Sequence, residues 1–199
     1  MSESRPAPHP EPPPDLASRD LPLIQIKDLW FRIHKSQYSP LYYGSSRRNR
    51  FDAPSQEYGV MYVAADVCGA FIETFGASTG IRVVALSELR LCSVSQLQSE
   101  RQLALVDLTG SGLARIGADA RLCDGEHGLA QRWALSLWRH PENLDGIYYR
   151  ARHDPSRYCA AIFDRAQADI TIAQTQAYWS DDFRETLAYI LDTYGFGLV

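Results

Sequence analysis

The sequence predicts a mixed α+β fold in one domain. Hydrophobic residues make up 45% of its 199 residues, which is enough to bury the core of one domain. The predicted strands are short, and helices interrupt them irregularly, which favours α+β over a doubly wound sheet. No G-x-G-x-x-G motif follows a predicted strand and no G-x-x-x-x-G-K motif is present. Neither a Rossmann site nor a P-loop is therefore predicted.

The amino-terminal segment, residues 1–20, is predicted to be a disordered, proline-rich tail. Its prolines are Pro6, Pro8, Pro10, Pro12, Pro13 and Pro14. Proline opposes both helix and strand pairing, and the segment has little apolar surface to bury. We expect folding to begin near Leu21, so that the folded domain covers residues 21–199.

Most of the domain is predicted to form short strands, with one helix in the first half of the chain. Runs of aliphatic, β-branched and aromatic residues predict strands around Arg32 and over Val60–Ala65, Ile81–Leu86, Leu103–Leu108, Gly146–Tyr149, Tyr158–Phe163 and Ile170–Tyr178. Asp66 is a favourable N-cap for a helix that runs to Phe75 and stops at Gly76. This helix directly follows the second strand.

Two more helices are predicted in the second half of the chain. One ends before Pro141, and its apolar stripe consists of Leu129, Ala130, Trp133, Ala134, Leu137 and Trp138. The other is capped by Ser180 or Asp181 and ends at Gly195. Its apolar face consists of Phe183, Leu187, Ile190, Leu191 and Tyr194.

Charge and hydropathy narrow the classes of partner. The formal net charge is −4, which disfavours direct binding of nucleic acid, because that function needs a basic face. The basic run Arg47–Arg50 remains compatible with a small phosphate ligand. No apolar signal core or membrane-length run is present, so we expect no membrane partner and a cytoplasmic protein.

Cysteine and histidine do not predict a metal site. The four cysteines contain no C-x-x-C pair and are expected to be reduced thiols. The histidines considered are His34, His127, His140 and His153, which are scattered through the sequence. We expect them to be ordinary surface or core residues, and we expect no metal.

Four polar side chains stand in an otherwise apolar part of the chain, namely Arg32, Arg50, Tyr62 and Glu73. Arginine offers a planar fork of donors that fits phosphate oxygens. Tyrosine offers a ring for stacking, and glutamate offers a negative charge to a developing cation. Together these groups suit a ligand with a diphosphate, a ribose and a flat cationic base, as in NAD.

The blocks around these residues resemble the RES domain family. The resemblance runs from about Leu29 to Asp164, and its blocks are Trp30–Ile33, Asn49–Phe51, Val60–Ala64, Phe71–Gly76, Leu105–Gly110, Leu113–Ala118, Gln131–Ala134 and Asp145–Arg152. It implies an ADP-ribosyltransferase-like fold with short-stranded split sheets and flanking helices. It also implies degradation of NAD by a toxin that a partner antitoxin, here expected to be a helix-turn-helix protein, holds inactive.

The resemblance also implies a role for each polar residue. Arg32 would lie in the NAD pocket, Arg50 would lie against the NAD phosphates, and the two arginines together would hold the diphosphate. The ring of Tyr62 would lie beside the nicotinamide ribose. Glu73 would hold the ribose hydroxyls and stabilise an oxocarbenium-like transition state.

The chain departs from the family at the serine. The family pattern resembles G-I-x-Y-x-S-R, whereas this chain has Ala151 at the serine position. Ser156, five residues downstream, is not expected to substitute for it. The missing hydroxyl implies either reduced activity or a subgroup that does without it.

The function predicted on this basis is cleavage of the nicotinamide–ribose bond of NAD, by a phosphorylase or a glycohydrolase. The acceptor stays open between phosphate, water and a protein side chain. One alternative is a catalytically weak module that binds NAD or the antitoxin, which Ala151 favours. Another is a protein ADP-ribosyltransferase. The sequence also leaves a homo-oligomer open.

Overall fold

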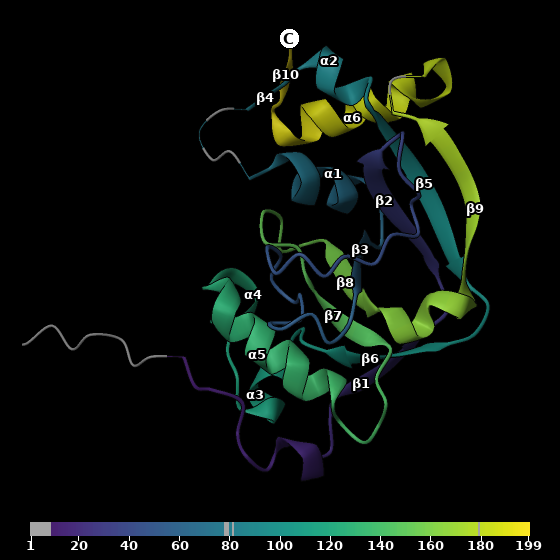
Figure 1. Ribbon diagram of the computed structural model, residues 1–199. Helices are drawn as coiled ribbons and strands as arrows, with labels where there is room; N and C mark the ends of the chain where they lie inside the picture. The colour runs from purple at the N-terminus through teal and green to yellow at the C-terminus, as the bar shows by residue number, and fades with distance from the viewer. Residues whose placement is uncertain (1–8, 78–79, 81, 179) are drawn as a thin grey trace, which may run out of the picture.

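A computed structural model of the chain (Figure 1) describes residues 9–77, 80, 82–178 and 180–199. Its main element is an eight-stranded sheet with the strand order β1-β6-β7-β8-β3-β2-β5-β9. The strands of this sheet are β1 (Leu23–Ile26), β2 (Leu29–Lys35), β3 (Val60–Ala64), β5 (Cys92–Ser99), β6 (Leu103–Asp107), β7 (Gly146–Arg150), β8 (Tyr158–Phe163) and β9 (Ile170–Ala177). A second, parallel pair joins β4 (Val83–Val84) to β10 (Gly197–Leu198).

The large sheet divides between β2 and β3. These strands share one facing pair, Phe31 with Ala64, whereas β2 faces β5 at seven positions and β3 faces β8 at five. Within the sheet only β6 and β7 run parallel, and the other named pairs are antiparallel. The prediction of an α+β fold with short strands, a split sheet and flanking helices is confirmed.

Two groups of helices flank the two halves of the sheet (Figure 1). The helices are α1 (Val67–Phe75), α2 (Leu86–Leu89), α3 (Gly112–Ile116), α4 (Arg121–Asp124), α5 (His127–Trp138) and α6 (Arg184–Tyr194). Helix α1 contacts β2 and α6, whereas α3 contacts β6, and α4 contacts α5. None of the helices described is long and apolar enough to cross a membrane.

The core lies on both faces of the sheet. Along β3, Val60 and Ala64 join the larger core cluster, which includes the helices, and Met61 and Val63 join the smaller cluster on the other face. This alternation follows from the two-residue period of a strand. It places the ring of Tyr62 on the side of the helices.

Helix α1, strand β8 and the end of helix α6 match the prediction, whereas α6 itself begins at Arg184, after a short 3₁₀ helix over Asp181–Phe183. Helix α1 begins where the Asp66 carboxylate accepts a hydrogen bond from the Gly69 amide at 2.8 Å, and it ends before Gly76. Strand β8 has the predicted bounds. Helix α6 ends at Gly195, whose φ of 63° is a left-handed conformation that glycine adopts without strain.

The predicted strand over 81–86 is largely wrong. Only Val83–Val84 is a strand, and Leu86 already begins α2, while residue 81 lies outside the described residues. Strands β1 and β5 were not predicted. Five of the eight residues of β5 (Cys92–Ser99) are serine or glutamine, so its composition resembles a loop, although its neighbours β2 and β9 bury most of it.

The described part of the amino-terminal segment, residues 9–20, lies against α5 and the end of α3. Leu16 is 3% exposed and belongs to the larger core cluster. The Trp133 indole N–H donates to the Pro10 carbonyl at 3.0 Å, and Arg132 pairs with Glu11 at 2.5 Å. In these residues the packed chain therefore begins before Leu21.

We predict that Leu16→Ala destabilises the protein by about 2–5 kcal/mol, because the substitution leaves a cavity at a buried site. Leu91→Ala is the control, since Leu91 is 61% exposed, and surface changes usually stay within about 0.5 kcal/mol. Urea unfolding of both variants measures the difference. Equal stability of the two variants would show that residues 9–20 do not pack on the domain.

Candidate functional site

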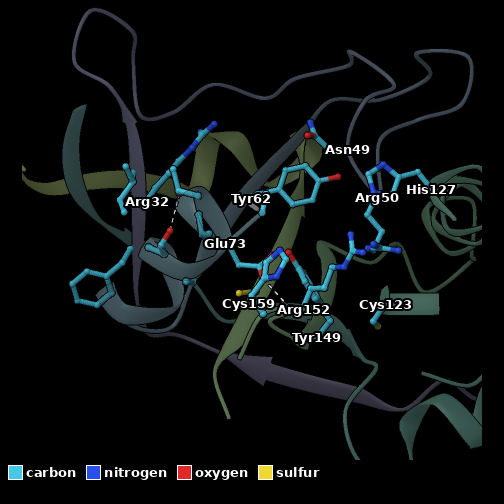
Figure 2. A pocket seen from close by; sticks show the side chains of 18 residues that line it. Arg32, Asn49, Arg50, Tyr62, Glu73, Cys123, His127, Tyr149, Arg152 and Cys159 are labelled. Carbon is cyan, nitrogen blue, oxygen red and sulfur yellow. Dashed lines mark hydrogen bonds between the residues drawn. The ribbon is translucent and has the colours of Figure 1, made fainter. Parts of the chain in front are cut away.

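A cavity of about 490 Å³ lies where the sheet divides. Its walls come from β2, β3, α1, the loop before β3, the start of α5 and the turn after β7. The cavity brings together four of the five predicted site residues, which are Arg32, Arg50, Tyr62 and Glu73. Figure 2 shows Tyr62 and Glu73 between the two arginines.

The Tyr62 ring is held through its hydroxyl. This hydroxyl donates to Asp52 Oδ1 at 3.1 Å and accepts from the Phe51 amide at 2.9 Å. Burial and the neighbouring Asp52 raise the pKa of Tyr62 well above its usual value. The side chain is therefore a neutral, fixed ring whose open face lines the cavity.

Asp52 is fully buried and organises the loop that carries Arg50. Besides Tyr62, its carboxylate accepts from the Ser46 hydroxyl at 3.0 Å, from the Asn49 amide at 3.1 Å and from the Asn49 side chain at 3.2 Å. A buried carboxylate is tolerated only when such donors satisfy it. Sequence reasoning missed Asp52, and its one signal is its position directly after Arg50-Phe51.

The same loop is fastened to the helices beside it. Arg50 donates to the Gly125 carbonyl at 2.8 Å, and the Gln131 side chain donates to the carbonyls of Arg47 and Asn49, both at 2.9 Å. Arg47 has a φ of 63°, a strained conformation for a residue with a side chain. The contacts from α5 hold that conformation in place.

Glu73 lies on the cavity side of α1 and is half-buried. Its Oε1 accepts a hydrogen bond from the Arg152 backbone amide at 2.8 Å. No ion pair joins it to a basic side chain among the described residues. A fixed carboxylate without a bound cation can stabilise positive charge that develops on a ligand.

Arg32 lines the cavity from β2 and also holds the segment 40–42 by hydrogen bonds. Its Nη1 donates to the carbonyls of Pro40 at 2.6 Å and Tyr42 at 2.9 Å. Burial lowers the pKa of its guanidinium from the usual value. Figure 2 shows Arg32 on the opposite side of Tyr62 from Arg50, so the two arginines approach different ends of the cavity.

Ala151 is 1% exposed and is not among the described residues that line the cavity. It begins the turn after β7, where its amide donates to the Arg157 carbonyl at 2.9 Å. Ser156 does not line the cavity either, and its hydroxyl donates to Asp154 Oδ1 at 2.6 Å. The turn contributes Arg152 and His153 to the cavity.

Two histidines and two cysteines that the sequence analysis treated as ordinary residues also line the cavity. His127 faces it at the start of α5, with Nδ1 donating to the Arg48 carbonyl at 2.9 Å. Burial raises the thiol pKa of Cys123 to about 12 and also raises that of Cys159, so neither is suited to act as a nucleophile. All four cysteines are free thiols.

Comparisons with known proteins agree with this fold. The family model of the RES domain matches residues 29–183. A chain in the crystal structure of the M. tuberculosis MbcT–MbcA toxin–antitoxin complex is similar, with a TM-score of 0.67 and 15% identity over 83% of this chain and 92% of that chain. A comparison with curated proteins gives no match. The fold is ADP-ribosyltransferase-like, and the chain belongs to the RES domain family.

Proposed function

We propose that this chain is an enzyme that cleaves the nicotinamide–ribose bond of NAD. The observation that carries the proposal is the Glu73 carboxylate, which the Arg152 amide fixes in a cavity that also holds Tyr62 and Arg50. Membership of the RES family supports an enzyme that acts on NAD. The groups in the cavity match the parts of NAD, because they include a carboxylate, an aromatic ring and guanidinium groups.

The proposed reaction needs little covalent help from the protein. The bond between ribose C1′ and the nicotinamide nitrogen breaks, and its electron pair leaves with nicotinamide, which becomes neutral. Positive charge then develops on C1′ and the ring oxygen of the ribose. Glu73 stabilises this charge, and an acceptor oxygen closes the new bond at C1′ while its proton passes to solvent.

The other residues bind and orient the substrate in this proposal. Tyr62, locked by Asp52, presents its ring to the ribose, and Arg50 binds the diphosphate. Arg32 donates through Nη1 to the 40–42 segment and keeps Nε and Nη2 for the substrate. Ala151, at the position of the family serine, directly precedes Arg152, whose amide holds Glu73.

The acceptor and the biological setting are part of the proposal. Phosphate or water as acceptor would make the chain an NAD phosphorylase or an NAD glycohydrolase. The likeness to a chain of the MbcT–MbcA complex supports a toxin that acts in the cytoplasm and is held inactive by an antitoxin, for which we propose a helix-turn-helix protein. Ala151 favours one rival, a module that binds NAD but cleaves it weakly.

We predict that Glu73→Gln lowers the rate of nicotinamide release by about 10²–10³-fold, because single preorganised electrostatic groups contribute about 3–4 kcal/mol to a barrier. The glutamine oxygen can still accept from the Arg152 amide, so folding is retained. Glu185→Gln, on the exposed side of α6, is the control with the same change. Full turnover by Glu73→Gln would remove Glu73 from the mechanism.

We predict that Arg50→Ala and Arg32→Ala each weaken NAD binding about ten- to a hundredfold, since charge-assisted hydrogen bonds contribute about 1.5–3 kcal/mol. Calorimetry in the Glu73→Gln background keeps the substrate intact during the measurement. Arg48→Ala is the control, because Arg48 is exposed and only its backbone atoms make the hydrogen bonds described. The same loss in all three variants would indicate a diffuse basic surface.

A further inference from the structure

The charge in the cavity is strongly unbalanced. The basic side chains that line it are Arg32, Arg50, His127, Arg152 and His153, whereas Glu73 is its acidic side chain among the described residues. Three of the five basic groups are arginines, which stay charged at any working pH. A cavity of this composition attracts an anion.

The three arginines that line the cavity differ in how many of their guanidinium N–H groups already donate to other residues. Nη1 of Arg32 donates to two backbone carbonyls, and Nη1 of Arg50 donates to the Gly125 carbonyl. The guanidinium of Arg152 is exposed, and no ion pair, hydrogen bond or ring contact joins it to the described residues. It retains five unused donors.

The other arginines near this turn are paired. Arg150 donates to the Pro155 carbonyl at 2.6 Å and lies 4.9 Å from the centre of the Tyr158 ring. Arg157 forms ion pairs with Asp66 and Asp154. Of the three arginines in and beside this turn, Arg152 is therefore the one whose guanidinium has no partner among the described residues.

Arg152 also lies next to Arg50. The two side chains are drawn beside each other in Figure 2, away from Arg32. Burial and, after it, the charge of Arg152 lower the pKa of Arg50, which agrees with two guanidinium groups at short range. Two such groups repel each other when no carboxylate separates them, and an anion that binds both relieves the repulsion.

We propose that Arg152 is a substrate-binding residue and forms, together with Arg50, a two-arginine subsite for a diphosphate. The subsite excludes Arg32, which lies at the other end of the cavity. The assignment of this subsite to the diphosphate of NAD rests on the proposed function. The proposal that the subsite binds a diphosphate anion is independent of the proposed function.

Residue 152 then performs two tasks at once. Its backbone amide holds Glu73 Oε1 at 2.8 Å, and its side chain binds the diphosphate. Because Arg152 contacts both groups, it sets the distance between the bound diphosphate and the Glu73 carboxylate. This distance fixes where the ribose C1′ lies relative to Glu73. Accurate positioning of this kind lowers the barrier of the step that breaks the bond.

The test is binding of inorganic pyrophosphate and of ADP-ribose to the full chain, measured by calorimetry at fixed ionic strength. Arg152→Gln keeps the backbone amide that holds Glu73 and removes only the charge. We expect it to weaken both ligands about tenfold or more, with Arg152→Lys intermediate. Arg48→Gln is the matched control, and its binding should equal that of the unmodified protein.

Kinetics separate a binding role from a merely structural one. Arg152→Gln should raise KM for NAD about tenfold or more and change kcat less, whereas displacement of Glu73 would lower kcat at an unchanged KM. Unaltered binding in Arg152→Gln, or no binding of pyrophosphate and ADP-ribose by the unmodified protein, would overturn the proposal. Binding that depends on Arg152 without release of nicotinamide would support the subsite and refute NAD cleavage.

Discussion

The buried carboxylate of Asp52 is the contact on which the cavity depends. This carboxylate accepts hydrogen bonds from Ser46, Asn49 and Tyr62, and Asp52 is fully buried. Loss of any donor would leave a buried carboxylate short of hydrogen bonds, which is costly in a protein interior. The loop that carries Arg50 and the strand that carries Tyr62 are therefore fixed relative to each other before a ligand arrives.

The division of the sheet supplies the space that these groups surround. Because β2 and β3 share only the facing pair of Phe31 with Ala64, the sheet divides there, and both strands line the cavity. Helix α1 and the turn after β7 both contribute residues to the cavity wall. The hydrogen bond from the Arg152 amide to Glu73 joins these two elements, so the position of the carboxylate depends on both.

The sequence predicted best what short-range chemistry determines. Asp66 and Gly76 delimit α1 because an N-cap and a helix stop act locally. Strand β5 was missed because its polar residues are buried by neighbours that are distant in the sequence. Asp52 and Arg152 were missed for the same reason, since the importance of each comes from tertiary partners. The motif blocks located the cavity, but they did not separate Arg32 from Arg50.

These features describe a member of the RES family in which the proposed NAD site is already formed without a ligand. The most direct test is to incubate the purified chain with NAD, with and without phosphate, and to identify the products by mass spectrometry. We expect free nicotinamide in equal amount with ADP-ribose or its 1″-phosphate, and the identity of this second product reveals the acceptor. NAD that binds to the chain and is recovered intact would contradict the proposed cleavage.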